Sequence, residues 1–205
     1  TAEDAGGAGL SLAQIEPLLC VAGRYVLPVP FAETIFARAI LTRAGFEPPP
    51  GSMLLSRAGA SARGGLLVPS ATFGRTAQFA LLAAEGSWHL VSLSDAEVTP
   101  LGTLFDTSAR LHCPASATQL KFSSQQCDVT SLGAAIAAAQ MAGALSRVLE
   151  LTLQFASERR QFGRAIGKFQ AIQQQISVMA EHVAAATMAS KPAFSIEGTA
   201  PAPLF

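Results

Sequence analysis

The stretch that most constrains the fold is the segment from Glu158 to Gln170, which reads Glu-Arg-Arg-Gln-Phe-Gly-Arg-Ala-Ile-Gly-Lys-Phe-Gln and is called the elbow below. Gly163 and Gly167 interrupt two stretches with helical patterns, which predicts a helix break or bent hairpin. Ten consecutive residues of it hold four of the chain's 14 lysine and arginine residues: Arg159, Arg160, Arg164 and Lys168. Clustered guanidinium groups suit a phosphate or diphosphate, because the arginine fork binds oxyanions bidentately. The alternative is a solvated basic surface, since runs of charge usually coat surfaces.

Long helices are predicted on both sides of the elbow. Residues 130–157 are nearly all Ala, Leu, Ile, Met and Gly, which predicts a helix that is buried on most of its faces. The stretch after the elbow repeats apolar residues at helical spacing as far as Ser190, at Ile172, Ile176, Met179, Ala180 and Val183. The proline-containing tail after Lys191 predicts a loop.

Two shorter helices are predicted near the start of the chain. Ser11 is a suitable N-cap for a helix that reaches about Ala22, and Pro17 predicts either a kink or a later start. A second amphipathic helix is predicted from Phe31 to Arg43, and Gly45 ends it.

From Met53 to Ser124 the pattern changes to short apolar runs separated by Gly, Pro, Ser and Asp, which predicts an antiparallel sheet or a small barrel. The runs are 53–55, 65–68, 79–83, 88–93 and 119–122. Residues 84–87, Ala-Glu-Gly-Ser, predict a hairpin turn. The chain is therefore predicted to be α+β, with a helical segment 1–50, a β-domain 51–128 and a second helical segment 129–205.

Composition narrows the classes of partner. The 14 acidic residues balance the 14 basic ones, which argues against nucleic acid or an anionic membrane. Cys20, Cys113 and Cys127 have no metal-type spacing and suit a reducing cytoplasm. The histidines have no partners at ligand spacing, so no metal site is predicted. No membrane span is predicted, because no uninterrupted apolar run is long enough, and we expect a cytoplasmic protein.

The elbow also carries a family resemblance. Its pattern Arg-x-Gln-Phe-Gly-x-x-Ile-x-x-Phe-Gln, followed by Ala-Ile-Gln, resembles the flavin-contacting signature of the acyl-CoA dehydrogenases. Residues Thr1 to Gly9 resemble a glycine-rich loop of the same family, and a β-domain between helical segments is similar to its order of elements. The resemblance implies FAD as cofactor, bound mainly by a neighbouring subunit at this place. It assigns contacts with FAD to four residues: Arg159, Gln161, Phe162 and Gln170.

The function implied by the resemblance is FAD-dependent α,β-dehydrogenation of an acyl-CoA thioester, an oxidoreductase reaction of fatty acid metabolism. It also implies a homo- or hetero-oligomer, a dimer or tetramer, and an electron-transfer partner. Relative to the family, the chain is expected to lack the beginning of the N-terminal helical domain and the last helices of the C-terminal one.

The chain departs from the family in the β-region. The Thr-Glu-x-x-x-Gly-Ser-Asp-like segment and the Gly-x-Lys-x-Phe/Trp-Ile-Thr-like strand are absent, and residues 53–67 contain no acidic residue. This departure favours an alternative: a non-catalytic subunit of a heteromeric acyl-CoA dehydrogenase that contributes to a partner's flavin site. A third hypothesis, a helical scaffold that binds no cofactor, requires the elbow motif to have lost its role.

The catalytic base of the family is a glutamate, and it stays unknown for this chain. Glu150 lies in the corresponding helical segment, but a surface ion pair with Arg147 one turn away explains it more simply. Glu197 lies in Ile-Glu-Gly-Thr, which resembles the surroundings of one family base. Its place in the sequence is too early for that role.

Overall fold

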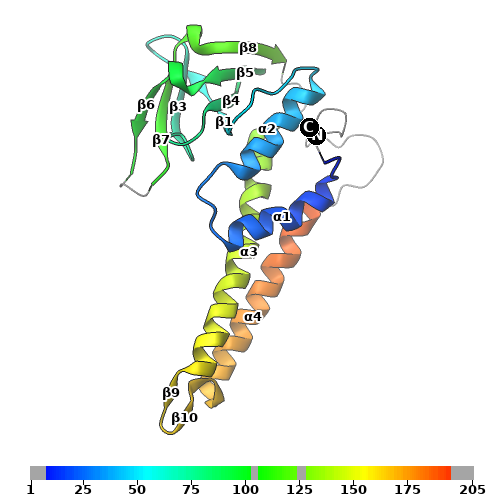
Figure 1. The fold of residues 1–205 in the computed structure, drawn as a ribbon, viewed down its shortest axis with the longest axis vertical. Helices are drawn as coiled ribbons and strands as arrows, with labels where there is room; N and C mark the ends of the chain where they lie inside the picture. Colours follow the sequence, from blue (N-terminus) through cyan, green and yellow to red (C-terminus); the bar gives the residue numbers. More distant parts are fainter. Residues whose placement is uncertain (1–7, 103–105, 124–127, 195–205) are drawn as a thin grey trace. The chain divides into compact units, whose positions relative to one another are not determined.

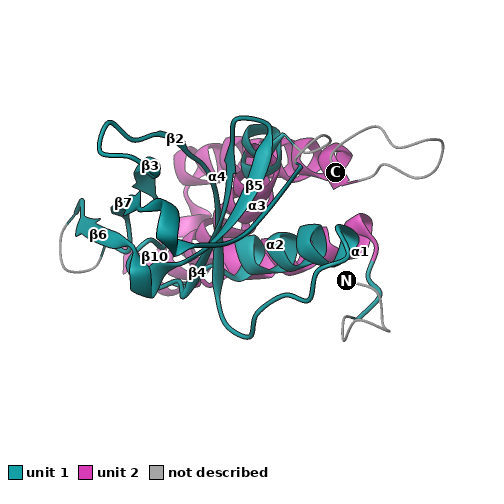
Figure 2. Ribbon diagram, turned by 90° about the horizontal axis from the view of Figure 1, so that it is seen from above, with its two compact units in different colours: residues 1–10, 28–133, 199–205 teal, residues 11–27, 134–198 magenta. Residues whose placement is uncertain are grey.

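The computed structural model describes residues 8–102, 106–123 and 128–194. These ranges divide into two compact units: unit 1 contains residues 8–10 and 28–133, and unit 2 contains 11–27 and 134–194 (Figure 2). The division groups the first helix with the C-terminal helices and the second helix with the sheets. The domain boundaries that the sequence predicts, after residues 50 and 128, divide the chain into consecutive segments instead, and they stay a prediction.

Unit 1 contains two four-stranded sheets (Figure 1). The first has the order β1 (Met53–Arg57), β4 (Phe79–Ala84), β5 (Ser87–Ser92), β8 (Thr118–Ser123). The second has the order β2 (Gly59–Ala60), β3 (Leu66–Ala71), β7 (Ala109–Cys113), β6 (Glu97–Pro100). Pairing is antiparallel except between β1 and β4, which are parallel because the chain visits the second sheet between them. The α+β fold and all five predicted strands are confirmed.

The predicted hairpin turn is also confirmed. Ala84 pairs with Ser87, and the two residues between them, Glu85 and Gly86, have φ angles of +49° and +71°. A two-residue loop with both φ angles positive is a type I′ turn, whose twist matches that of the flanking strands.

Alternation along β1, β4 and β5 builds two cores on opposite faces of the first sheet. Leu54, Ala80 and Val91 lie on the face that packs against Val68, Leu111 and Cys113 of the second sheet, as in a sandwich. The other face carries Met53, Leu81, Trp88 and Leu90, and α2 (Phe31–Arg43) covers it with Ala37, Ile40 and Leu41. The bounds of α2 match the predicted helix, and Gly45 follows it with a φ of +83°.

The described part of unit 2 contains α1 (Leu12–Arg24), most of α3 (Val129–Glu158), the elbow, α4 (Gln170–Ser190) and a short 3-10 turn, Lys191–Phe194. Ser11 caps α1 as predicted: its hydroxyl accepts a hydrogen bond from the backbone N–H of Gln14, and the Gln14 side chain accepts one from the Ser11 N–H. Pro17 lies near the middle of α1, which begins at Leu12, so the alternative of a later helix start is wrong. Helices α3 and α4 lie side by side and are joined by the elbow (Figure 1).

Helices α1 and α3 meet at two glycines. A Cβ atom on Gly143 of α3 would lie 1.8 Å from the backbone oxygen of Cys20, and one on Gly23 of α1 would lie 1.9 Å from the backbone oxygen of Gln140. Both distances are far below van der Waals contact, so the crossing requires a residue without Cβ on each helix.

The prediction that α3 is buried on most faces is wrong over its second half. Met141 and Phe155 are 61% and 60% exposed, and Val148, Leu151 and Leu153 are also exposed. Among the described residues of unit 2, the elements that could cover the helix are α1, the elbow, α4 and the 3-10 turn Lys191–Phe194. Helix α3 is also long and apolar enough to cross a membrane by length and composition, with one third of the relevant window buried, which corrects the sequence expectation. One such helix is weak support for a span, because core helices of soluble proteins have the same composition.

A small polar cluster joins α1 to the end of α4. The carboxylate of the buried Glu16 accepts hydrogen bonds from the Cys20 thiol and from the Ser190 hydroxyl, each at 3.2 Å. Burial, and then the hydrogen bond to Glu16, raise the pKa of Cys20 to about 11. Cys20 is therefore a structural thiol, neutral at physiological pH.

We expect Cys20 to react slowly with iodoacetamide at neutral pH and faster as the pH rises toward 11, because only the thiolate is nucleophilic. The same raised pKa means that the neutral thiol stabilises the fold below pH 9.0, its ordinary pKa, and that this contribution is lost as the pH rises through about 11. Peptide mapping by mass spectrometry measures the alkylation rate, with urea-unfolded protein as control. Equal rates in the folded and unfolded protein would contradict the raised pKa.

Candidate functional site

The elbow forms a tight β-hairpin between the two long helices. Strands β9 (Arg160–Gln161) and β10 (Arg164–Ala165) pair antiparallel, and the backbone N–H of Ile166 donates to the carbonyl of Arg159 at 2.8 Å. A 3-10 turn, Ile166–Lys168, leads from β10 to α4. The predicted helix break and bent hairpin are confirmed.

Phe162 occupies an unusual position at the tip of this hairpin. It and Gly163 are the two turn residues, with φ angles of +50° and +78°, so the turn is again of type I′. A bulky residue with positive φ is strained, and asparagine, aspartate or glycine is the common choice there. The Phe162 side chain is also 90% exposed. Strain at an exposed aromatic residue points to a role in binding rather than in folding.

Phe169 contacts the side chains of Phe162 and Arg164 in the hairpin. Its ring lies edge to face with that of Phe162, with 6.2 Å between centroids and 90° between planes. The guanidinium carbon of Arg164 lies 4.3 Å from the centroid of the Phe169 ring, which is cation–π geometry. The Gln173 carboxamide donates to the carbonyl of Gly167 at 3.1 Å and ties the 3-10 turn to α4.

The cations of the elbow have no acidic partners within the described ranges. None of Arg159, Arg160, Arg164 and Lys168 forms an ion pair there, and all four side chains are exposed. Among the residues that the structure describes, no side chain caps the N-terminus of α4, which begins at Gln170, so its first backbone N–H groups add to the positive potential at this end. An uncompensated positive charge of this kind suits an anionic ligand.

All four residues assigned to cofactor contact from the sequence lie in this hairpin or at the first position of α4, and all four are exposed: Arg159, Gln161, Phe162 and Gln170. Their role stays a prediction. Sequence reasoning missed Phe169 and Gln173, although both belong to the quoted motif and its extension. Their contacts depend on a turn geometry that sequence spacing does not specify.

A cavity of about 480 Å³ lies beside the elbow between α3 and α4. Leu153, Ala156 and Ile176 give it an apolar floor, while Lys168 and Gln173 supply a cation and a carboxamide. Because Gln173 already uses its NH₂ group on Gly167, its carbonyl oxygen is the group that could accept a further hydrogen bond.

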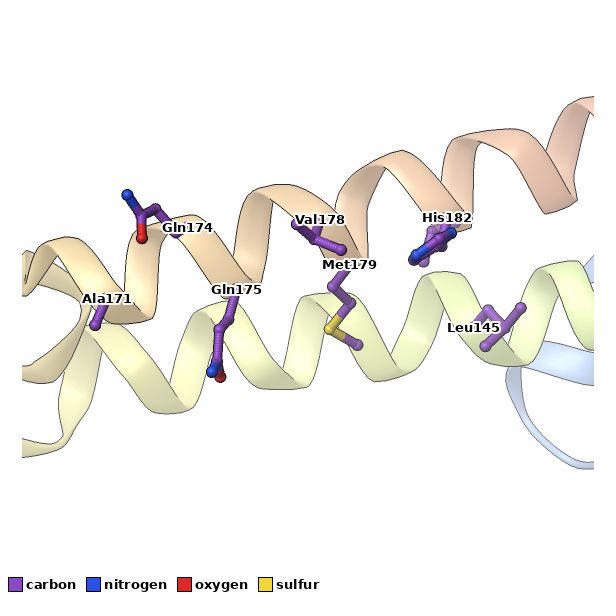
Figure 3. Close-up of a pocket in the computed structure, with 8 residues that line it drawn as sticks. Leu145, Ala171, Gln174, Gln175, Val178, Met179 and His182 are labelled. Atoms are coloured by element: carbon purple, nitrogen blue, oxygen red, sulfur yellow. The ribbon is translucent and has the colours of Figure 1, made fainter.

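A second cavity, of about 590 Å³, lies farther along the same two helices (Figure 3). Gln175 and Met179 extend from α4 over α3, where Leu145 contributes to the lining. The lining is mostly apolar, and His182 is its one titratable residue. This pattern is typical of a surface that packs against another apolar element.

Glu150 is engaged in ion pairs. Its carboxylate accepts hydrogen bonds from both ends of the Arg24 guanidinium, at 2.5 and 2.6 Å, and one from Arg147 at 3.2 Å. The hydrogen bond from Arg24, and then that from Arg147, lower the pKa of Glu150. A carboxylate with a lowered pKa and two cationic partners is a poor proton acceptor, which supports the ion-pair interpretation. Glu197 lies outside the described residues.

The β-region forms strands where its sequence lacks acidic residues. Residues 53–67 contain β1, β2 and the first two residues of β3. In the described ranges, no three histidine, cysteine, aspartate or glutamate side chains gather as metal ligands.

Comparison with known proteins identifies similar chains. The family described as "Acyl-CoA dehydrogenase, C-terminal domain" matches residues 129–197, which include α3, the elbow and α4. The acyl-CoA dehydrogenase FadE34 of Mycobacterium tuberculosis is 32% identical over 226 residues, covering 96% of this chain and 30% of that protein. The acyl-CoA dehydrogenase IpdE2 of Mycolicibacterium smegmatis is 31% identical, covering 90% of this chain and 57% of that protein.

Solved structures also match the fold. The ChsE4–ChsE5 complex from Mycobacterium tuberculosis matches with a TM-score of 0.70 at 21% identity, covering 93% of this chain and 65% of the matched chain. Identity at this level supports the fold alone. The chain spans less than two thirds of the length of each of these relatives.

Proposed function

This chain belongs to the acyl-CoA dehydrogenase family, and from that premise we propose that it serves FAD-dependent α,β-dehydrogenation of an acyl-CoA thioester. The observation that supports the proposal is the elbow, whose cations form no ion pair with any described residue and whose Phe162 is strained and exposed. The cations fit the diphosphate of FAD, because exposed arginines without acidic partners keep their donors available for oxyanions.

In this proposal Arg159 binds the diphosphate through its guanidinium, and Gln161 and Gln170 donate hydrogen bonds from their carboxamides. Phe162 offers an aromatic face to a planar ring of the cofactor. When bound, FAD supplies the acceptor for the hydride that leaves the β-carbon of the thioester. The structure argues against Glu150 as the base that takes the α-proton, because two arginines hold its carboxylate.

A specific observation favours the second candidate, a non-catalytic subunit that contributes the elbow to a partner's flavin. Residues 53–67 form strands but lack the acidic residues by which family members hold flavin and substrate. The four candidate contact residues, Arg159, Gln161, Phe162 and Gln170, are all exposed, so they are available to a ligand that another chain holds. The match to the ChsE4–ChsE5 complex, whose name describes two different components, is compatible with such an assembly.

Reduction of the flavin by substrate distinguishes the two candidates. The purified chain is loaded with FAD under anaerobic conditions and an acyl-CoA is added while the visible flavin absorption is recorded. We expect the absorption to bleach if this chain dehydrogenates the thioester. FAD that binds but is not bleached by short-, long- or steroid-chain acyl-CoA would support the non-catalytic subunit and contradict the dehydrogenase.

A further inference from the structure

Phe169 contacts two exposed side chains of the β9–β10 hairpin, those of Phe162 and Arg164. The Phe162 and Phe169 rings meet edge to face with a centroid distance of 6.2 Å, and the Arg164 guanidinium lies over the Phe169 ring at 4.3 Å. Phe169 itself is half-buried between the 3-10 turn and α4, and its carbonyl accepts the first two helical hydrogen bonds of α4, from Ile172 and Gln173. The backbone of Phe169 is therefore fixed to the start of the helix, and its ring lies against the hairpin.

Contact with Phe169 restricts the orientation of an otherwise solvent-exposed ring. The Phe162 side chain is 90% exposed, so little else in unit 2 restricts its rotation. An aromatic ring that is already ordered loses less conformational entropy when a ligand stacks on it. The edge-to-face geometry occupies only part of the Phe162 ring and leaves a face of it open to a ligand.

Contact with Phe169 also separates the cations into two groups. Arg164 is held over the ring by the cation–π contact, whereas Arg159, Arg160 and Lys168 make no such contact within the described residues. The elbow thus carries an exposed aromatic ring in contact with Phe169 together with three exposed cations that form no ion pair among the described residues.

We propose that Phe169 is a positioning residue that makes the elbow prefer an adenine nucleotide to a bare diphosphate. It holds the Phe162 ring in place for stacking on the base, while the free cations bind the diphosphate. This inference rests on the proposed function, because it takes the elbow to be the site of the cofactor's diphosphate. Phe169 acts through Phe162 and has no contact with the ligand itself.

Two probes separate recognition of the base from recognition of the diphosphate. ADP contains both an adenine base and a diphosphate, whereas pyrophosphate contains the diphosphate without the base. We expect Phe169→Leu to weaken ADP binding about tenfold, a typical contribution of one base–aromatic stack, and to change pyrophosphate binding less than about twofold. Phe169→Tyr keeps the ring and should restore the wild-type ratio of the two affinities. Phe155→Leu, at an exposed phenylalanine of α3 outside the elbow, is the matched control and should change neither affinity.

Isothermal titration of the full chain measures both affinities. Parallel loss of ADP and pyrophosphate binding in Phe169→Leu would overturn the inference, because it would mean that the residue only supports the fold of the hairpin. Unchanged binding of both probes would overturn it as well. If Arg159→Ala abolishes pyrophosphate binding while Phe169→Leu has no selective effect, the proposed function stands and the positioning role fails. A wild-type chain that binds neither probe contradicts both.

Discussion

Replacing Gly143 by alanine is expected to destabilise unit 2 by about 1–3 kcal/mol or more, the range typical of overpacked interiors. The new Cβ atom would lie 1.8 Å from the backbone oxygen of Cys20, so α1 must move away from α3. Backbone atoms cannot rotate aside as a side chain can. Displacement of α1 would also strain the hydrogen bonds of Glu16 with Cys20 and Ser190. Urea denaturation followed by far-ultraviolet circular dichroism measures the change.

The same helix offers the matched control, Gly133→Ala. A Cβ atom at Gly133 meets nothing within 4 Å, so alanine there should stabilise α3 by roughly 0.5–1 kcal/mol through its higher helix propensity. The two substitutions are chemically identical and are expected to have opposite signs. Equal stability of the two variants would show that the close α1–α3 crossing does not exist in solution.

Arg159→Ala is expected to weaken FAD binding by roughly 10- to 100-fold, which corresponds to the loss of a charge-assisted hydrogen bond of about 1.5–3 kcal/mol. The fold should be unaffected, because the Arg159 side chain is exposed and forms no ion pair among the described residues. Arg159→Lys keeps the positive charge but loses the forked guanidinium group, so its FAD affinity should lie between those of the wild type and the alanine variant. Equilibrium titration of flavin fluorescence measures the affinity.

Arg110→Ala serves as the control for loss of charge. Arg110 is an exposed arginine of β7 in unit 1 and lies outside the elbow, so its removal should leave FAD affinity unchanged. A comparable loss of affinity in the Arg110 and Arg159 variants would mean that net charge, and not the elbow, attracts the cofactor.

Local sequence signals predicted the elements of the fold well. Helix α2 has the predicted bounds, Ser11 caps α1, and the turn at Glu85 and Gly86 forms the expected hairpin, because each depends on residues close together in sequence. Strands β6 and β7 were not predicted. They are short and carry polar or proline residues, so their formation depends on pairing with neighbouring strands of the sheet.

The packing of elements far apart in the chain could not be predicted from the sequence. The grouping of α1 with α3 depends on Gly23 and Gly143, which are separated by 120 positions and give no local signal of contact. The four candidate site residues were assigned by resemblance to a motif. The motif does not reveal that Phe162 adopts a positive φ angle, since phenylalanine disfavours that conformation, or that Phe169 contacts Phe162 and Arg164.

The visible absorption spectrum of the purified chain after incubation with FAD and removal of the free cofactor tests the central claim most directly. If the elbow holds the diphosphate, the protein fraction of the wild type should keep a flavin spectrum, and that of Arg159→Ala should lose it. A colourless wild-type protein, confirmed by intact mass to be the full chain, would contradict FAD binding by this chain alone.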